Sequence, residues 1–271
     1  MTSLPAETAQ SLETAIQQDG FAFVAHGTMR QLLERFGGLD DWNRFADSWN
    51  GLAVDTYLAA TGRQRRRRHG VFSAAPGEPV RSEPHQPHYQ SLHYNPLQGD
   101  IERWFEPVLP EAATSNSLAT VIGFSRAVFE RAARASPRWH IEVHQFRIEP
   151  HPDQPGEPTP EGMHRDGVDY VLVLLVDRTN IARGTTSIHA DDGRELGSFT
   201  LAQPLDAALV DDARVCHGVT AVTPLAPGMP AHRDVLVLTF RATPSAPPAS
   251  APPVGAALAA IGDRSLVPVP D

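Results

Sequence analysis

The most strongly patterned segment of the chain is Tyr170-Val-Leu-Val-Leu-Leu-Val176. It is apolar throughout and rich in valine, which favours extended backbone. An uninterrupted apolar run of this length predicts a buried strand, because a helix with the same burial is usually longer. The segment is therefore the predicted centre of a β-rich domain.

Shorter strands are expected on both sides of this segment, with glycine and proline between them. Short strands at close spacing favour an antiparallel sandwich or barrel. Three stretches predict helices, and the last has Ser117 as its candidate N-cap and ends before Pro137. The predicted strands lie at residues 20–24, 141–148, 170–176, 198–201, 207–210, 214–219 and 234–240, and the predicted helices at 11–18, 29–36 and 117–135.

These elements predict one domain over residues 1–243. Residues 1–138 form its helical and mixed part, whereas residues 139–243 contain most of the strands and form its core. Residues 244–271 are rich in proline, alanine and serine, which predicts a mobile extension with little role in the fold. A docked segment at residues 254–261 is the alternative for this tail.

The composition disfavours several classes of partner. The net charge of −9 and the pI near 5.7 argue against binding to nucleic acid or to an anionic membrane surface. No apolar run approaches the roughly 20 residues of a membrane-spanning helix, and the N-terminal residues lack the pattern of a secretory signal. A single cysteine, Cys216, is typical of a reducing compartment, so we expect a cytoplasmic protein. The oligomeric state does not follow from the sequence.

Two histidines and one aspartate form the candidate metal site. His164 and Asp166 are separated by one residue, so their side chains point the same way in extended backbone. Several strands fit between Asp166 and His217, so a late strand can bring His217 back to the pair. Two imidazoles and a carboxylate on one face suit iron(II) and leave coordination positions open. A surface His–Asp pair and a buried core histidine are the alternative interpretations.

Arg233 stands just before the strand predicted at residues 234–240. A guanidinium binds a carboxylate through two parallel hydrogen bonds, so a late arginine is what a dicarboxylate cosubstrate would need. A surface ion pair of Arg233 with Asp234 or Asp212 is the alternative.

Six segments carry a family pattern. In order along the chain they are Arg65-Arg-Arg-Arg-His-Gly-Val-Phe72, His88-Tyr-Gln-Ser-Leu-His-Tyr-Asn-Pro96, Arg103-Trp-Phe-Glu-Pro107, Met163-His-Arg-Asp-Gly-Val-Asp-Tyr-Val171, Asp211-Asp-Ala-Arg-Val-Cys-His-Gly-Val-Thr220 and His232-Arg-Asp-Val-Leu-Val-Leu-Thr-Phe240. Together they resemble the bacterial iron(II)- and 2-oxoglutarate-dependent dioxygenases typified by L-isoleucine dioxygenase. The resemblance extends over residues 20–242, and residues 184–189 depart from its pattern.

The resemblance implies a mainly β fold with flanking helices, built on a double-stranded β-helix core of the jelly-roll, cupin-like type. It implies iron(II) held by His164, Asp166 and His217, and 2-oxoglutarate held by Arg233. It also implies an activity in which 2-oxoglutarate and O₂ are consumed to hydroxylate a small substrate, a free aliphatic L-amino acid, with release of succinate and CO₂. Desaturation and sulfur oxidation use the same three ligands.

Further polar residues are candidates for binding the cosubstrate or the substrate. Gln145 and Arg147 lie two apart on one strand, so both face the iron cavity if either does. Thr220 is a candidate donor to the cosubstrate. The charged run at residues 63–69 is a solvated face by default, with one or two arginines turned inward as the alternative. Candidate pocket residues are His88, Tyr89, Gln90 and Asn95, and candidate partners of an α-ammonium group are Asp169, Asp211 and Asp212.

Two other functions stay open. A cupin-like metalloenzyme without 2-oxoglutarate would use the same metal ligands but would not need Arg233. A β-sandwich that binds a small molecule without catalysis would need neither the ligands nor the arginine. Anaerobic addition of iron(II) with 2-oxoglutarate gives a visible absorption band only in the dioxygenase.

Overall fold

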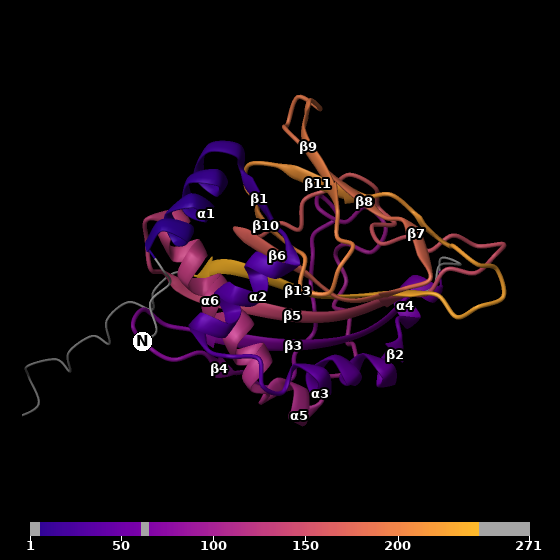
Figure 1. The fold of residues 1–271 in the computed structure, drawn as a ribbon, viewed down its shortest axis with the longest axis horizontal. Helices are drawn as coiled ribbons and strands as arrows, with labels where there is room; N and C mark the ends of the chain where they lie inside the picture. Colours follow the sequence, from indigo (N-terminus) through magenta and orange to yellow (C-terminus); the bar gives the residue numbers. More distant parts are fainter. Residues whose placement is uncertain (1–5, 61–64, 244–271) are drawn as a thin grey trace, which may run out of the picture.

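The computed structural model describes residues 6–60 and 65–243. The predictions for Arg63 and for the tail at residues 244–271 lie outside these ranges. Within them, a large antiparallel sheet faces a smaller set of strands, and helices cover the outer face of the large sheet (Figure 1). This arrangement confirms the mainly β architecture with flanking helices.

The large sheet has eight strands in the order β1-β10-β6-β13-β5-β3-β2, with β4 paired to β3. All of its pairings are antiparallel, and the long strands lie at its centre. The bounds are β1 (Phe21–Val24), β2 (Ala53–Val54), β3 (Arg66–Ala74), β4 (Arg81–Ser82), β5 (Arg138–Ile148), β6 (Tyr170–Thr179), β10 (Ala207–Asp211) and β13 (His232–Thr243).

The strands opposite the large sheet form two short groups. One has the order β11-β8-β9 and the other pairs β12 with β7. Their bounds are β7 (Ile181–Arg183), β8 (Thr185–His189), β9 (Glu195–Thr200), β11 (Cys216–Val219) and β12 (Val222–Pro224). Because β11 carries His217, this layer brings one candidate metal ligand over the large sheet.

Side chains of β6 alternate between two apolar environments. Leu172 and Leu174 are fully buried in the core between the sheet and the helices. Val171 and Val173 project from the opposite face and line a cavity between the two layers. Because both faces of β6 are covered, the strand has no polar face, which explains the uninterrupted apolar run at residues 170–176.

Helix α6 packs on the large sheet, where its Phe129 stacks on Tyr170 with ring centroids 4.8 Å apart. The N-cap of α6 is Ser115, whose Oγ accepts from the backbone N–H of Leu118, so the predicted cap at Ser117 is wrong. The bounds are α1 (Ala6–Asp19), α2 (His26–Phe36), α3 (Trp42–Asp47), the 3₁₀ helix η1 (Ser48–Gly51), α4 (Thr56–Ala59), α5 (Pro110–Ala113) and α6 (Asn116–Ala133).

Six strands were not predicted, among them β3 and β8. The charged run that includes Arg67 and His69 is not a solvated face but part of β3, and both side chains are buried. The departing segment at residues 184–189 contains β8, which pairs with β11 on one side and β9 on the other. In the described part of the chain, no helix has the length and apolar character needed to cross a lipid bilayer.

Candidate active site

A cavity of about 240 Å³ lies between the two layers. Its floor is the inner face of the large sheet, where odd-numbered residues of β13 and even-numbered residues of β5 point inward because side chains alternate along a strand. Its other walls come from β11 and from the loops at residues 88–98 and 158–168. His164, Asp166, His217 and Arg233 all line this one cavity.

The three candidate metal ligands converge. Nε2 of His164 lies 3.7 Å from Oδ1 of Asp166, and Nε2 of His217 lies 3.5 Å from Oδ2 of the same carboxylate. Two backbone hydrogen bonds, of 3.0 and 2.9 Å, join His164 and His217 and fix their separation. One donor atom from each of the three residues lies within 4.8 Å of the other two. This set of two nitrogens and one oxygen suits iron(II).

The backbone around Asp166 is held by the buried carboxylate of Asp212. Oδ1 of Asp212 accepts from the N–H of Asp166 at 3.0 Å, and Oδ2 accepts from the next two N–H groups at 2.8 and 3.1 Å. Gly167 has a φ of +79°, and a Cβ there would lie 2.4 Å from the ring of Tyr94. Only glycine fits at this position, and the resulting turn directs Asp166 toward both histidines.

Hydrogen bonds and charge define the protonation of the ligands. Nδ1 of His164 donates to the carbonyl oxygen of Gly162 at 3.0 Å, which leaves Nε2 to face Asp166. Burial lowers the pKa of His164, but the Asp166 carboxylate outweighs this effect and raises it to about 9. Burial lowers the pKa of His217 to about 4, so this ring is neutral. A metal ion that displaces the His164 proton therefore meets one carboxylate and two ring nitrogens.

Arg233 carries a buried guanidinium, only 2% exposed, at another part of the same cavity. Its Nε and Nη2 have no hydrogen-bond partner among the described residues. Burial and the neighbouring Arg178 lower its pKa to about 10, so it stays protonated at neutral pH. Asp234 pairs with Arg147 instead, at 2.6 Å, so the surface ion pair with Arg233 is wrong. A buried cation with unused donors favours an anionic ligand.

Comparison with known proteins gives the family. The sequence model of the 2OG-Fe dioxygenases matches residues 46–239, a range that contains the three candidate ligands and Arg233. The chain belongs to the 2OG-Fe dioxygenase family. Iron(II) is therefore its metal and 2-oxoglutarate its cosubstrate. The alternatives without 2-oxoglutarate, a cupin-like enzyme and a non-catalytic binding module, do not agree with this match.

Two relatives share the family. The 3(1)-hydroxy-L-isoleucine 4-dioxygenase of Pantoea ananatis (strain AJ13355) is 26% identical over 236 residues, which cover 84% of this chain and 94% of the relative. The L-isoleucine-4-hydroxylase of Bacillus thuringiensis is 28% identical over 158 residues, which cover 56% of this chain and 64% of the relative. Identities of this size do not establish the substrate of this dioxygenase.

Solved structures agree on the fold. A bsmA homolog from Methylobium petroleophilum PM1 is 36% identical, with a TM-score of 0.77, and the match covers 86% of this chain and 93% of that structure. IDO from Bacillus thuringiensis matches with a TM-score of 0.69 at 18% identity, over 90% of this chain and 98% of that structure. The fold is the double-stranded β-helix of the 2OG-Fe(II) dioxygenases, as predicted.

Gln145 and Arg147 of the dioxygenase project from the outer face of β5, away from the cavity. Nε2 of Gln145 donates to Oγ of Ser48 at 2.8 Å, and Arg147 pairs with Asp234. The prediction that Gln145 and Arg147 face the iron cavity is wrong, because the cavity face of β5 carries the even-numbered residues.

Thr220 and the predicted ammonium partners also lie outside the cavity. Thr220 is exposed, and its Oγ1 accepts from the backbone N–H of Thr185 at 2.9 Å. Asp169 accepts from the N–H of Ala242, and Asp212 holds the loop around Asp166. These predictions are wrong because the carboxylates satisfy backbone N–H groups of the fold. Asp211, the third of them, does not line the cavity either.

The predicted pocket residues do line the cavity, namely His88, Tyr89, Gln90 and Asn95. Nε2 of Gln90 donates to the carbonyl oxygen of Asp166 at 3.2 Å, and Oε1 of Gln90 accepts from Arg103 at 2.8 Å. This loop therefore connects the candidate metal ligands to the buried Arg103, for which the sequence predicted no individual role. The alternative prediction for the charged run was that one or two of its arginines turn inward. It is confirmed for Arg65 and Arg67, which also line the cavity.

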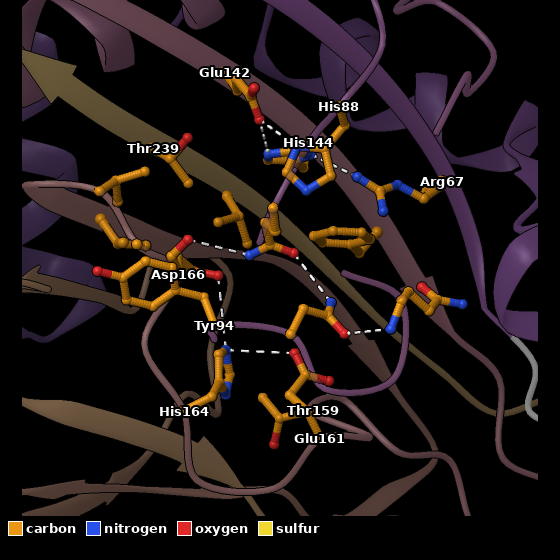
Figure 2. Close-up of a pocket in the computed structure, with 18 of the residues that line it drawn as sticks. Arg67, His88, Tyr94, Glu142, His144, Thr159, Glu161, His164, Asp166 and Thr239 are labelled. Atoms are coloured by element: carbon orange, nitrogen blue, oxygen red, sulfur yellow. Dashed lines mark hydrogen bonds and ion pairs between the residues drawn. The ribbon is translucent and has the colours of Figure 1, made fainter. Parts of the chain in front are cut away.

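A second polar group lies across the cavity from His164 (Figure 2). It contains Glu142 and His144 from β5, His88 from the loop, and Arg67 from β3. Sequence reasoning did not identify Glu142 or His144 as site residues. The available signal was the alternation of His140, Glu142 and His144 along one strand, which places three titratable side chains on one face.

Proposed function

We propose that this dioxygenase hydroxylates a side-chain carbon of a free aliphatic L-amino acid. The observation that supports the proposal most strongly is the presence of three convergent metal donors and an unpaired buried guanidinium in one cavity. The substrate class is supported by the two relatives, which are named for L-isoleucine and for a hydroxylated L-isoleucine. The single cysteine supports a cytoplasmic location.

In this proposal His164, Asp166 and His217 bind iron(II). Their three donor atoms come from the turn before β6 and from β11, which the paired backbone hydrogen bonds hold together. Arg233 binds the distal carboxylate of 2-oxoglutarate, because two of its nitrogen atoms have no hydrogen-bond partner within the described ranges. The pairing of a planar guanidinium with a carboxylate also orients the cosubstrate.

Iron(II), when bound with 2-oxoglutarate and O₂, supplies the oxidation of a C–H bond to an alcohol while 2-oxoglutarate is converted to succinate and CO₂. The residues of the chain bind and orient the substrate and keep water out. Val171 and Val173 of β6 and Val235 and Val237 of β13 give the cavity an apolar wall that suits an aliphatic side chain. This placement of one C–H bond is the main contribution of the protein.

The charged groups of the cavity support a substrate with a carboxylate. Arg67 and Arg103 are both buried and line the cavity, and Nε of each has no hydrogen-bond partner among the described residues. Buried guanidinium groups with unused N–H donors favour carboxylate ligands. A free amino acid meets this requirement, whereas an amino acid ester does not.

The test uses the full chain loaded with iron(II). Anaerobic addition of 2-oxoglutarate should produce a visible absorption band, and succinate release in air should increase with L-isoleucine, L-leucine, L-valine or L-methionine. Mass spectrometry should find one added oxygen atom in the amino acid. The free-amino-acid proposal is wrong if only N-acylated or esterified forms gain oxygen, although the dioxygenase activity itself would stand.

A further inference from the structure

Glu142 lies at the centre of four histidines on the cavity face of the large sheet, and we call these five residues the Glu142 cluster. Oε2 of Glu142 lies 2.5 Å from Nδ1 of His88, 3.3 Å from Nε2 of His144 and 3.6 Å from Nε2 of His69. In the part of the chain that the structure describes, Oε1 has one partner, Nε2 of His140 at 3.4 Å. Oε2 of this buried carboxylate therefore lies near three histidine nitrogens, whereas Oε1 lies near one and can accept further hydrogen bonds.

The Glu142 cluster offers enough donor atoms for a metal ion. One ligand atom from each of four members lies within 4.8 Å of the other three, and these members are His69, His88, Glu142 and His144. The contact between Arg67 and His144 disfavours metal binding by this cluster. Nη2 of Arg67 lies 2.7 Å from Nδ1 of His144, and a guanidinium only donates, so Nδ1 is the acceptor. The proton of the neutral His144 ring is then on Nε2, the atom that faces Glu142. That nitrogen has no lone pair for a metal ion.

Three histidines beside the Glu142 carboxylate carry no charge at neutral pH. Burial lowers the pKa of His69 to about 4 and lowers those of His88 and His144, so these rings are neutral near pH 7. Burial raises the pKa of Glu142, but the hydrogen bonds of the histidines outweigh it and hold the pKa well below its usual value. Among the described residues, the ion-pair partners of Glu142 are the four histidines of the cluster alone.

The wider group of interacting charges has no net charge. Arg65, Arg67 and Arg103 interact with three carboxylates, those of Asp55, Glu142 and Glu161. Arg65 and Arg67 share Asp55, at 2.9 and 3.8 Å, so Asp55 is already paired. The hydrogen-bond acceptors of Arg103 among the described residues are the amide oxygens of Gln90 and Gln98, at 2.8 Å each. Within residues 6–60 and 65–243, Glu142 therefore has no direct ion pair with an arginine, and Arg103 has none with a carboxylate. A ligand that carries both charges could pair with each of them.

We propose that Glu142 accepts the α-ammonium group of the substrate, with the substrate carboxylate directed to Arg103 and Arg67. This inference rests on the proposed function and names the residues that select a zwitterion. Figure 2 shows Glu142 and Arg67 on the side of the cavity away from His164. With its charged end held there, the amino acid presents its side chain, and not its α-carbon, to the candidate iron ligands.

The experiment compares two ligands that differ in one group, an amino acid and the 2-hydroxy acid in which a hydroxyl replaces its ammonium group. The amino acid is whichever of L-isoleucine, L-leucine, L-valine and L-methionine releases most succinate. Binding is measured by calorimetry under anaerobic conditions, with the full chain loaded with iron(II) and 2-oxoglutarate. The proteins are the wild type, Glu142→Gln, and Glu149→Gln as the matched control, because Glu149 pairs with Arg66 and does not line the cavity.

The wild type and Glu149→Gln should bind the amino acid about 10- to 100-fold more tightly than the hydroxy acid, the usual effect of one hydrogen bond to a charged group. In Glu142→Gln this ratio should fall toward 1. Equal affinities in the wild type would overturn the proposal whether or not Glu142→Gln folds. Equal weakening of both ligands in Glu142→Gln, or two metal ions per chain, would also overturn it.

The outcomes separate this inference from the proposed function. If the amino acid is bound and hydroxylated without discrimination against the hydroxy acid, the proposed function stands and the role of Glu142 is wrong. If none of the four amino acids binds while the 2-oxoglutarate absorption band forms, the amino acid substrate and the role of Glu142 are both wrong.

Discussion

Nη2 of Arg67 lies 2.7 Å from Nδ1 of His144, and this contact joins a permanent cation to a ring that must stay neutral to accept from it. The guanidinium also stacks on the ring of Phe105, with its carbon 3.5 Å from the centroid. Arg67 is thereby fixed beside His144 and opposes its protonation. Burial and this neighbouring cation keep the His144 ring uncharged.

Stability should fall on acidification because the buried histidines of this cluster resist protonation. His69 is fully buried, and its pKa is about 4 in the folded chain against an ordinary value of 6.5. A histidine with a depressed folded pKa contributes stability that is present above pH 6.5 and is lost as the pH falls toward 4. For His69 this loss amounts to about 2 kcal/mol between pH 7.5 and pH 5.

The measurement is urea unfolding at these two pH values, for the wild type and for His69→Phe. The other titrating groups are common to both proteins, so the difference between their pH dependences isolates His69. The free energy of unfolding of His69→Phe should depend less steeply on pH. Parallel pH profiles for the two proteins would show that His69 does not resist protonation in the folded chain.

Replacement of His217 by alanine should abolish iron binding and turnover without unfolding the domain. The loss should exceed the roughly 10- to 100-fold that follows removal of a group that only supports a metal ligand. The measurements are iron content, succinate release and melting temperature. His189→Ala is the matched control, because His189 lies on the neighbouring strand β8 and does not line the cavity. Normal 2-oxoglutarate consumption by His217→Ala would remove His217 from the iron site.

Arg233→Lys should raise the KM for 2-oxoglutarate by about 10- to 100-fold, because an ammonium group cannot reproduce the two parallel hydrogen bonds of a guanidinium. Iron affinity should stay near normal, since Arg233 is not among the metal donors. Arg147→Lys serves as the control on the outer face, where the arginine pairs with Asp234. An unchanged KM in Arg233→Lys would count decisively against this assignment.

The sequence predicted those parts of the site that depend on local geometry. The apolar run at residues 170–176 identified β6, because seven apolar residues in succession require cover on both faces. His164 and Asp166 could be paired because residues two apart share a side in extended backbone. His217 lies on the later strand β11. The sequence allowed its return to His164 and Asp166, because several strands fit between Asp166 and His217.

The errors arose where packing between distant strands decides the outcome. The alternation on β5 groups Gln145 with Arg147 and Glu142 with His144, but both groups are polar, so the pattern does not show which face meets the cavity. The register of β5 with β3 and β13 determines which face of β5 meets the cavity. The same limit applies to the arginines of β3, whose charge predicts a solvated face by default, since only their neighbours on other strands make their burial favourable.

Asp212 should control iron affinity through the backbone of the turn that carries Asp166. Its carboxylate accepts three backbone N–H groups from Asp166 and the two residues after it. In Asp212→Asn one carboxylate oxygen becomes an NH₂ donor that faces another donor, so the turn loses hydrogen bonds and Asp166 loses its orientation. Iron affinity should fall about 10- to 100-fold, as it does when groups that support metal ligands are removed.

The measurement is an iron titration against a competing chelator, with the KM for 2-oxoglutarate determined at saturating iron. The KM should change little, because Asp212 does not line the cavity near Arg233. Asp211→Asn is the matched control, since the side chain of Asp211 lies near Arg214, at 4.0 Å, and is not bonded to the turn. If both variants bound iron as tightly as the wild type, the turn would hold Asp166 without Asp212, and Gly167 with its +79° φ would be the feature that orients the carboxylate.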